Sequence, residues 1–96
     1  MAASAPLVLV LAITGPIARS DLPGLCNRVC VLLQRSRAPL ALVGLGGVQP
    51  DAVTVDALAR LQVVAQRHGC QLRLRNASAE LLELRDLMGL ADVLAE

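Results

Sequence analysis

The amino-acid sequence predicts an α/β protein with a small, mainly parallel or mixed sheet of about four strands and covering helices. Short apolar runs alternate with longer segments of helical periodicity along the chain. Hydrophobic residues make up 55% of the 96 residues, which is enough for a compact core. Glycine or proline follows most of the apolar runs and separates the elements. We therefore expect one domain over residues 1–96, with its core within about residues 7–94.

The first strand is expected over residues 7–14, which are apolar on both alternations and so suit a strand covered on both faces. Gly15-Pro16 ends it, and a further short strand near residues 16–18 is left open. Ser20 is the expected N-cap of the next helix, and Pro23 is tolerated in its first turn. Its buried stripe is Leu22, Cys26, Val29 and Leu33.

The second strand is expected over residues 40–45 and is closed by Gly46-Gly47. A helix then runs from Asp51 to about His68, with Gly69 as its stop signal. Its inward residues are Leu58, Leu61 and Ala65.

Residues 70–75 alternate apolar and polar side chains, which predicts a half-exposed strand near a sheet edge. Asn76-Ala77-Ser78 caps a last helix, and Gly89-Leu90 is typical of a Schellman ending. The inward residues of this helix are expected to be Leu81, Leu84 and Met88.

Composition excludes several classes of function. The chain contains no Phe, Tyr or Trp, so it has no stacking platform for single-stranded nucleic acid. Its net charge of +1 and scattered arginines do not form the basic stripe of a nucleic-acid binder. No apolar stretch reaches the roughly twenty residues of a membrane span, and the first run is read as a strand rather than a signal peptide. A cytoplasmic protein that does not span the membrane is expected.

Metal and catalytic sites are not predicted. Cys26, Cys30, Cys70 and His68 could supply zinc ligands, but they lack the usual paired loop spacing, so we interpret the cysteines as small buried hydrophobes. The single histidine has no obvious catalytic partner, and Gly44–Gly47 lacks the Lys-Ser/Thr of a phosphate-binding loop. We expect no enzyme activity, no catalytic residue, no metal and no cofactor.

Several segments occur in an order that is typical of one family. They are Leu11–Ile17, Pro50–Leu58, His68–Leu74, Asn76–Ser78, Leu87–Leu90 and Asp92–Leu94. With them, the chain from about residue 7 to residue 94 resembles the STAS domain family of bacterial anti-sigma factor antagonists and sulfate-transporter tails. The resemblance implies a STAS-like fold, in which the segment opening the second main helix reads Asp-Ser-Ser/Thr-Gly.

That segment departs from the family pattern here. In the antagonists one of its hydroxyls is phosphorylated by the anti-sigma kinase, and the phosphate breaks the complex. Asp51 matches the family's Asp, but Ala52 and Val53 stand at the two hydroxyl positions and Thr54 replaces the glycine. An acceptor needs an oxygen nucleophile, so the usual serine phosphorylation is not expected. Thr54 is left as a displaced candidate phosphoacceptor, and the alternative is that its hydroxyl helps to cap the helix or hydrogen-bonds back to the first turn.

We therefore predict a non-enzymatic regulatory or adaptor protein, similar to an anti-sigma factor antagonist and acting in the regulation of transcription. Its partner would be a kinase-like anti-sigma factor or an ATPase subunit. The alternative is the STAS subunit of a transport ATPase, or a nucleotide- or lipid-sensing module with a pocket at the strand ends. The predicted partner-binding residues are Gly47, Asp51, Ala52, Val53, Thr54 and Asp56, with Val55 in the same apolar patch and Arg60 at its rim.

Overall fold

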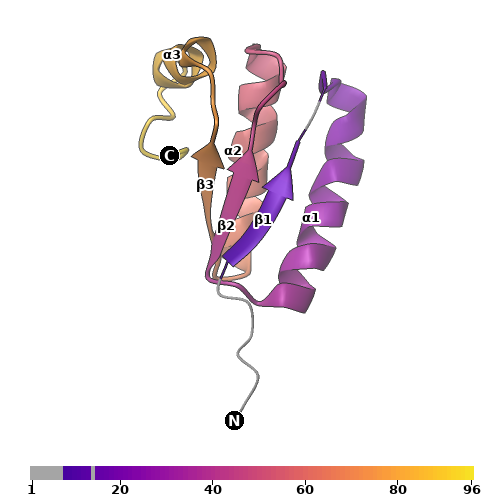
Figure 1. The fold of residues 1–96 in the computed structure, drawn as a ribbon. Coiled ribbons are helices and arrows are strands. Elements are labelled where there is room, and N and C mark those ends of the chain that lie inside the picture. Colours follow the sequence, from indigo (N-terminus) through magenta and orange to yellow (C-terminus); the bar gives the residue numbers. More distant parts are fainter. Residues whose placement is uncertain (1–7, 14) are drawn as a thin grey trace.

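A computed structural model describes residues 8–13 and 15–96 and confirms the predicted alternation of strands and helices (Figure 1). A 3₁₀ turn at Arg19–Asp21 precedes the first helix. The elements are β1 (Val8–Ala12), α1 (Leu22–Ser36), β2 (Leu40–Gly44), α2 (Ala52–Arg67), β3 (Gln71–Arg75) and α3 (Ala79–Leu87).

The sheet is parallel, with strand order β1-β2-β3 and Val10, Leu42 and Arg73 in register. This confirms an α/β fold with a small parallel sheet. The described residues contain three strands, compared with the four or so expected. Residues 16–18, where a further strand was left open, form no strand.

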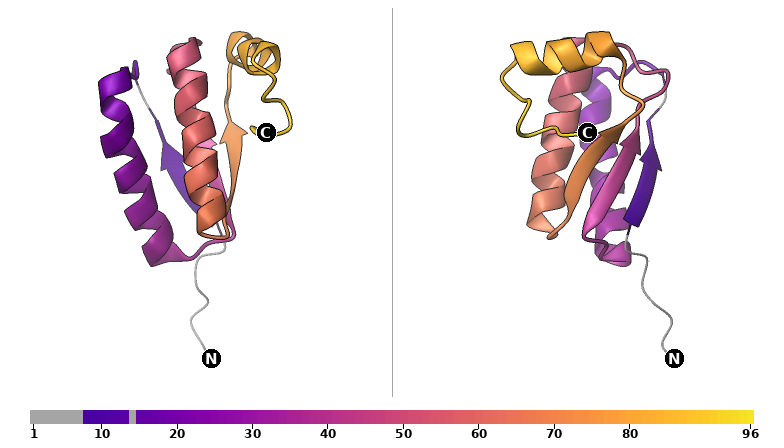
Figure 2. Two further views of the ribbon diagram at one scale, coloured as in Figure 1. Left: turned by 180° about the vertical axis from the view of Figure 1, so that it is seen from behind. Right: turned by 60° about the vertical axis from the view of Figure 1, so that its left-hand side comes forward.

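Helices α1 and α2 lie on the same face of the sheet (Figure 2). The strands are neighbours in chain order, so both crossovers advance across the sheet in the same direction. Because such crossovers are right-handed, two of them that advance in the same direction place their helices on the same face of the sheet. The opposite face is open, and the exposed fractions of Val8 and Val10 on it are 39% and 72%. The prediction that the first strand is covered on both faces is therefore wrong for Val8–Ala12, and residues 7 and 14 of the predicted strand lie outside the described residues.

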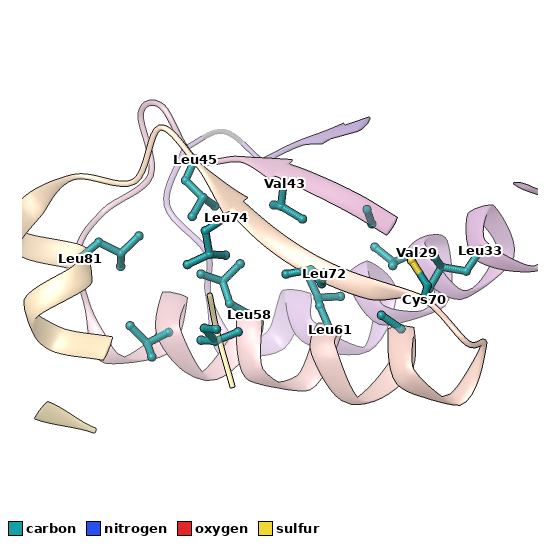
Figure 3. Close-up of a cluster of buried hydrophobic side chains, with 14 residues drawn as sticks. Val29, Leu33, Val43, Leu45, Leu58, Leu61, Cys70, Leu72, Leu74 and Leu81 are labelled. Carbon is teal, nitrogen blue, oxygen red and sulfur yellow. The ribbon is translucent and has the colours of Figure 1, made fainter. Parts of the chain in front are cut away.

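The core is aliphatic and lies between the sheet and the two crossover helices, as Figure 3 shows. Leu58 and Leu61 of α2 meet Leu72 and Leu74 of β3, and all four are at most 1% exposed. Each such leucine removed from water stabilises the fold by about 2 kcal/mol. The core also includes Leu81 of α3, whereas Met88 is exposed, contrary to prediction.

The helix ends follow local sequence signals, with one exception. Ser78 caps α3 by accepting a hydrogen bond from the Leu81 N–H at 3.1 Å. The Leu90 N–H donates to the Arg85 carbonyl at 3.0 Å, which completes the predicted Schellman ending. Ser20 is not the cap of α1, because it lies inside the 3₁₀ turn and Asp21 holds the N-cap position.

The outer edge of β3 is closed by a side chain and by the C-terminal segment, which runs beside the strand (Figure 2). The Leu72 N–H donates to Gln62 Oε1 at 3.0 Å, and Gln62 Nε2 donates to the Leu72 carbonyl at 3.2 Å. The same Nε2 donates to the Val93 carbonyl at 2.7 Å. The Leu74 N–H donates to the Ala95 carbonyl at 2.9 Å. Gln62 is only 4% exposed, and its buried side-chain amide satisfies backbone groups of Leu72 that a further strand would otherwise bond.

Candidate functional site

The connection from β2 to α2 lies at the carboxyl edge of the sheet, where ligands and partners of open α/β folds usually bind. Asp51 is the N-cap of α2, with extended backbone at φ −127° and ψ 168°. Its Oδ1 accepts a hydrogen bond from the Thr54 N–H at 2.8 Å. This bond satisfies one of the free N–H groups of the first turn and fixes the direction in which the helix leaves the loop.

Four of the predicted site residues are accessible on this connection or on the first turn of the helix. Gly47 is exposed and has φ +98°, a backbone conformation that favours glycine. Asp51 and Ala52 are exposed, and Val53 is half-buried. Together these residues form a small surface of one carboxylate beside short apolar side chains, which we call the α2-start surface. Such a surface can contact a partner but has no group pair for proton transfer.

Two residues predicted for this surface lie inside the protein. Thr54 and Val55 are both 0% exposed. Val55 belongs to the core cluster. The signal was present in the sequence, because Thr54 and Val55 continue the Leu58, Leu61 and Ala65 stripe one turn toward the N-terminus at helical spacing. The placement of Val55 in the surface patch is therefore wrong.

The Thr54 hydroxyl is enclosed and makes no hydrogen bond to any residue in the described part of the chain. It does not cap the helix, since the Asp51 carboxylate takes that position. A kinase must reach the hydroxyl oxygen, so the burial of Thr54 in this conformation argues against its prediction as a phosphoacceptor.

Asp56 and Arg60 lie on the same helix one turn further along. Asp56 Oδ2 and Arg60 Nε are 3.0 Å apart, and the two side chains are 35% and 58% exposed. A solvent-exposed pair of this kind contributes only a few tenths of a kcal/mol to the stability of the helix. Its charges therefore remain available at the rim of the α2-start surface.

Sequence reasoning missed two polar contacts. One is Gln62 at the edge of β3, described above. The other joins α1 to the end of α2, where Cys30 Sγ lies 3.3 Å from His68 Nε2. His68 is the C-cap of α2, so the helix ends where the sequence predicted. These contacts join residues 10 to 38 positions apart in sequence, so no local spacing signals them.

Residues 8–13 and 15–96 contain no group of three His, Cys, Asp or Glu side chains placed to hold a metal ion. No helix of the described chain is both long and apolar enough to cross a bilayer. No protein-family model matches the sequence, and no curated protein matches it significantly.

Proposed function

We propose that this protein is a STAS-like regulatory or adaptor domain that binds a protein partner through the α2-start surface and carries no serine phosphorylation switch. The observation that supports this best is the contrast between exposed and buried side chains at the start of α2. Asp51 and Ala52 are exposed, whereas the hydroxyl of Thr54 in the first turn of α2 is buried. Binding can therefore use this surface without phosphoryl transfer to it.

The proposed partner is an anti-sigma kinase or the ATPase subunit of a transporter. An apolar centre surrounded by a polar rim is the usual arrangement of a protein–protein contact. Asp51 and Asp56 would supply that rim, and the exposed Gly46-Gly47 turn lets a partner approach the backbone.

The test is affinity capture from the native cell, read by mass spectrometry, with wild-type and Ala52→Arg proteins as baits. Ala52 is exposed, so arginine blocks the surface without removing core packing. The control is Val63→Arg on the same helix, because Val63 is 47% exposed and three turns away from Ala52. We expect a kinase-like or ATPase subunit on wild type and on Val63→Arg, and its loss on Ala52→Arg. Equal capture by both variants would refute the α2-start surface as the interface.

A second test addresses the missing switch. Incubation of the protein with ATP and the captured kinase is expected to leave it unmodified. A phosphopeptide that includes Thr54 would show that the first turn of α2 opens to admit the kinase, and would restore the switch.

The open face of the sheet favours one alternative, a module that senses an anionic lipid or nucleotide. A hollow of about 750 Å³ there is lined by the aliphatic Val8, Leu40 and Leu42, by Arg73 and Arg75, and by the acidic Glu96. Aliphatic side chains beside two guanidinium groups suit a ligand with an apolar body and a phosphate. Titration calorimetry with ATP, GTP and vesicles of anionic phospholipid separates the two proposals, since the adaptor gives no heat with any of them.

A further inference from the structure

The contact between Cys30 and His68 joins two helices at the end of the molecule opposite the α2-start surface. Cys30 belongs to α1, and His68 is the C-cap of α2. The Sγ–Nε2 distance of 3.3 Å is a hydrogen bond between a thiol and an imidazole nitrogen. The backbone of His68 is held in place, because its N–H bonds to the Ala65 carbonyl at 3.0 Å.

We propose that Cys30 is a site of covalent modification by small electrophiles such as peroxides, with His68 as the acceptor of its proton. The thiolate rather than the thiol is the nucleophile, so a neighbouring base raises reactivity by taking the proton as the sulfur attacks. His68 supplies that base in the tautomer that leaves Nε2 unprotonated. Both side chains are partly exposed, so a small reagent can reach the sulfur.

The surroundings of His68 provide a place for such a reagent. His68 lines a hollow of about 580 Å³ together with Leu33, Gln34 and Arg37. Arg37 places a positive charge at this hollow. The hollow is independent of the proposed partner surface, so the failure of one proposal does not affect the other.

The other two thiols differ from Cys30 in ways that predict selectivity. Cys70 is 3% exposed, and burial raises the pKa of its thiol. Its Sγ lies 3.7 Å from the Gln71 carbonyl, a hydrogen-bond acceptor that cannot remove the proton. Cys26 is partly exposed like Cys30, but its thiol has no hydrogen-bond partner among the described residues. Cys26 therefore serves as the internal reference for an unassisted thiol.

With hydrogen peroxide the step is a two-electron oxidation of sulfur. His68 Nε2 takes the proton of Cys30, the sulfur lone pair attacks one peroxide oxygen, and the O–O bond breaks. The departing hydroxide receives the proton from the imidazolium and leaves as water. The products are a sulfenic acid on Cys30 and one molecule of water, and the peroxide is the species reduced.

The proposal is tested by timed alkylation of the native protein with iodoacetamide, with each thiol followed by peptide mass spectrometry. We expect Cys30 to react about tenfold faster than Cys26, and Cys70 to react most slowly. In His68→Gln the Cys30 rate should fall to that of Cys26. Arg67→Gln, a neighbouring exposed change without an imidazole, should leave all three rates unaltered. Equal rates for Cys30 and Cys26 in the wild type would overturn the proposal, as would an unchanged Cys30 rate in His68→Gln.

A second measurement does not depend on the folding of a variant. Wild-type protein is treated with hydrogen peroxide and dimedone, which traps sulfenic acids. The dimedone adduct is expected on the peptide that contains Cys30. An adduct confined to Cys26 or Cys70, or none at all while free Cys30 persists, contradicts the proposal.

Discussion

The two edges of the sheet are built in opposite ways. At the β3 edge, Gln62 and the C-terminal segment occupy the outward backbone groups of Leu72 and Leu74. At the β1 edge, the strand has a neighbour on its β2 side only within the described chain. The two edge strands also differ in charge. β3 contains arginines, whereas β1 reads Val-Leu-Val-Leu-Ala and has no charged residue.

An exposed strand edge is a template for pairing with other chains, and proteins usually protect it with charges or covering segments. The β3 edge has both kinds of protection. The β1 edge, as described here, has neither. We expect from this difference that losses at the β3 edge destabilise the domain more than changes on the exposed face of β1 do.

The largest effect is expected for Gln62→Leu. Leucine fills the same buried space but leaves the N–H and carbonyl of Leu72 and the carbonyl of Val93 without their partner. We expect a loss of about 3 kcal/mol in the free energy of unfolding, measured by urea denaturation. Gln66→Leu, an exposed change one turn further along α2, should cost less than about 0.5 kcal/mol. Equal losses for the two variants would mean that the edge contact is not what Gln62 contributes.

A smaller effect than that of Gln62→Leu is expected for Arg85→Leu. The Arg85 side chain is 14% exposed, and its NH1 group donates to the Leu94 carbonyl at 2.9 Å, so it holds the covering segment in place. A hydrogen bond from a charged donor contributes about 1.5 kcal/mol, and we expect a loss of that size in urea denaturation. Asp86→Asn removes only the ion pair with Arg85 and should cost less than about 0.5 kcal/mol. A larger loss in Asp86→Asn than in Arg85→Leu would contradict this explanation.

Cys70, immediately before β3, should make the free energy of unfolding fall at alkaline pH. Burial raises the pKa of its thiol in the folded protein, so the folded chain keeps a proton that the unfolded chain has already lost. The stabilising effect is complete below the unfolded thiol pKa of about 8.5 and is lost as the pH rises through the folded value. The chain has no Lys or Tyr side chain to obscure this range. Urea midpoints measured from pH 7 to pH 10 should decline less steeply in Cys70→Ala than in wild type, and parallel declines would refute the assignment.

The smallest effect is expected at the β1 edge, for Val10→Lys. Val10 is 72% exposed and its side chain lies on the open face, so the unfolding free energy should change by less than about 0.5 kcal/mol. Leu11→Ala, the adjacent residue on the helix-covered face, should cost about 2 kcal/mol because Leu11 packs against the core. If Val10→Lys proves as costly as Leu11→Ala, the open face is covered in solution.

The fold class and most elements could be predicted because they follow from local patterns. The alternation of β3, the caps at Asp51 and Ser78, and the stripe of α2 all lie within a few residues of one another. The exposure of β1 could not be predicted in this way. Its apolar pattern fits a doubly covered strand, and only the direction of both crossovers leaves one face open.

The candidate site could be predicted only in part. Asp51 and Ala52 are accessible as expected, because an N-cap and the residue after it lie at a helix tip. Thr54 is buried because the stripe of α2 begins one turn earlier than we inferred. Gln62 resembles an ordinary surface glutamine in sequence, and its partners are set by tertiary packing alone.

The burial of Leu94 has a practical consequence for recombinant work. Its side chain is 0% exposed, although it lies beyond the last helix in an irregular segment. A truncation at the end of α3, which the secondary structure alone would suggest, would remove a core leucine. It would also remove the segment that covers the outer edge of β3. Affinity tags that replace residues 93–96 would do the same, whereas a tag appended after them would leave the packing intact.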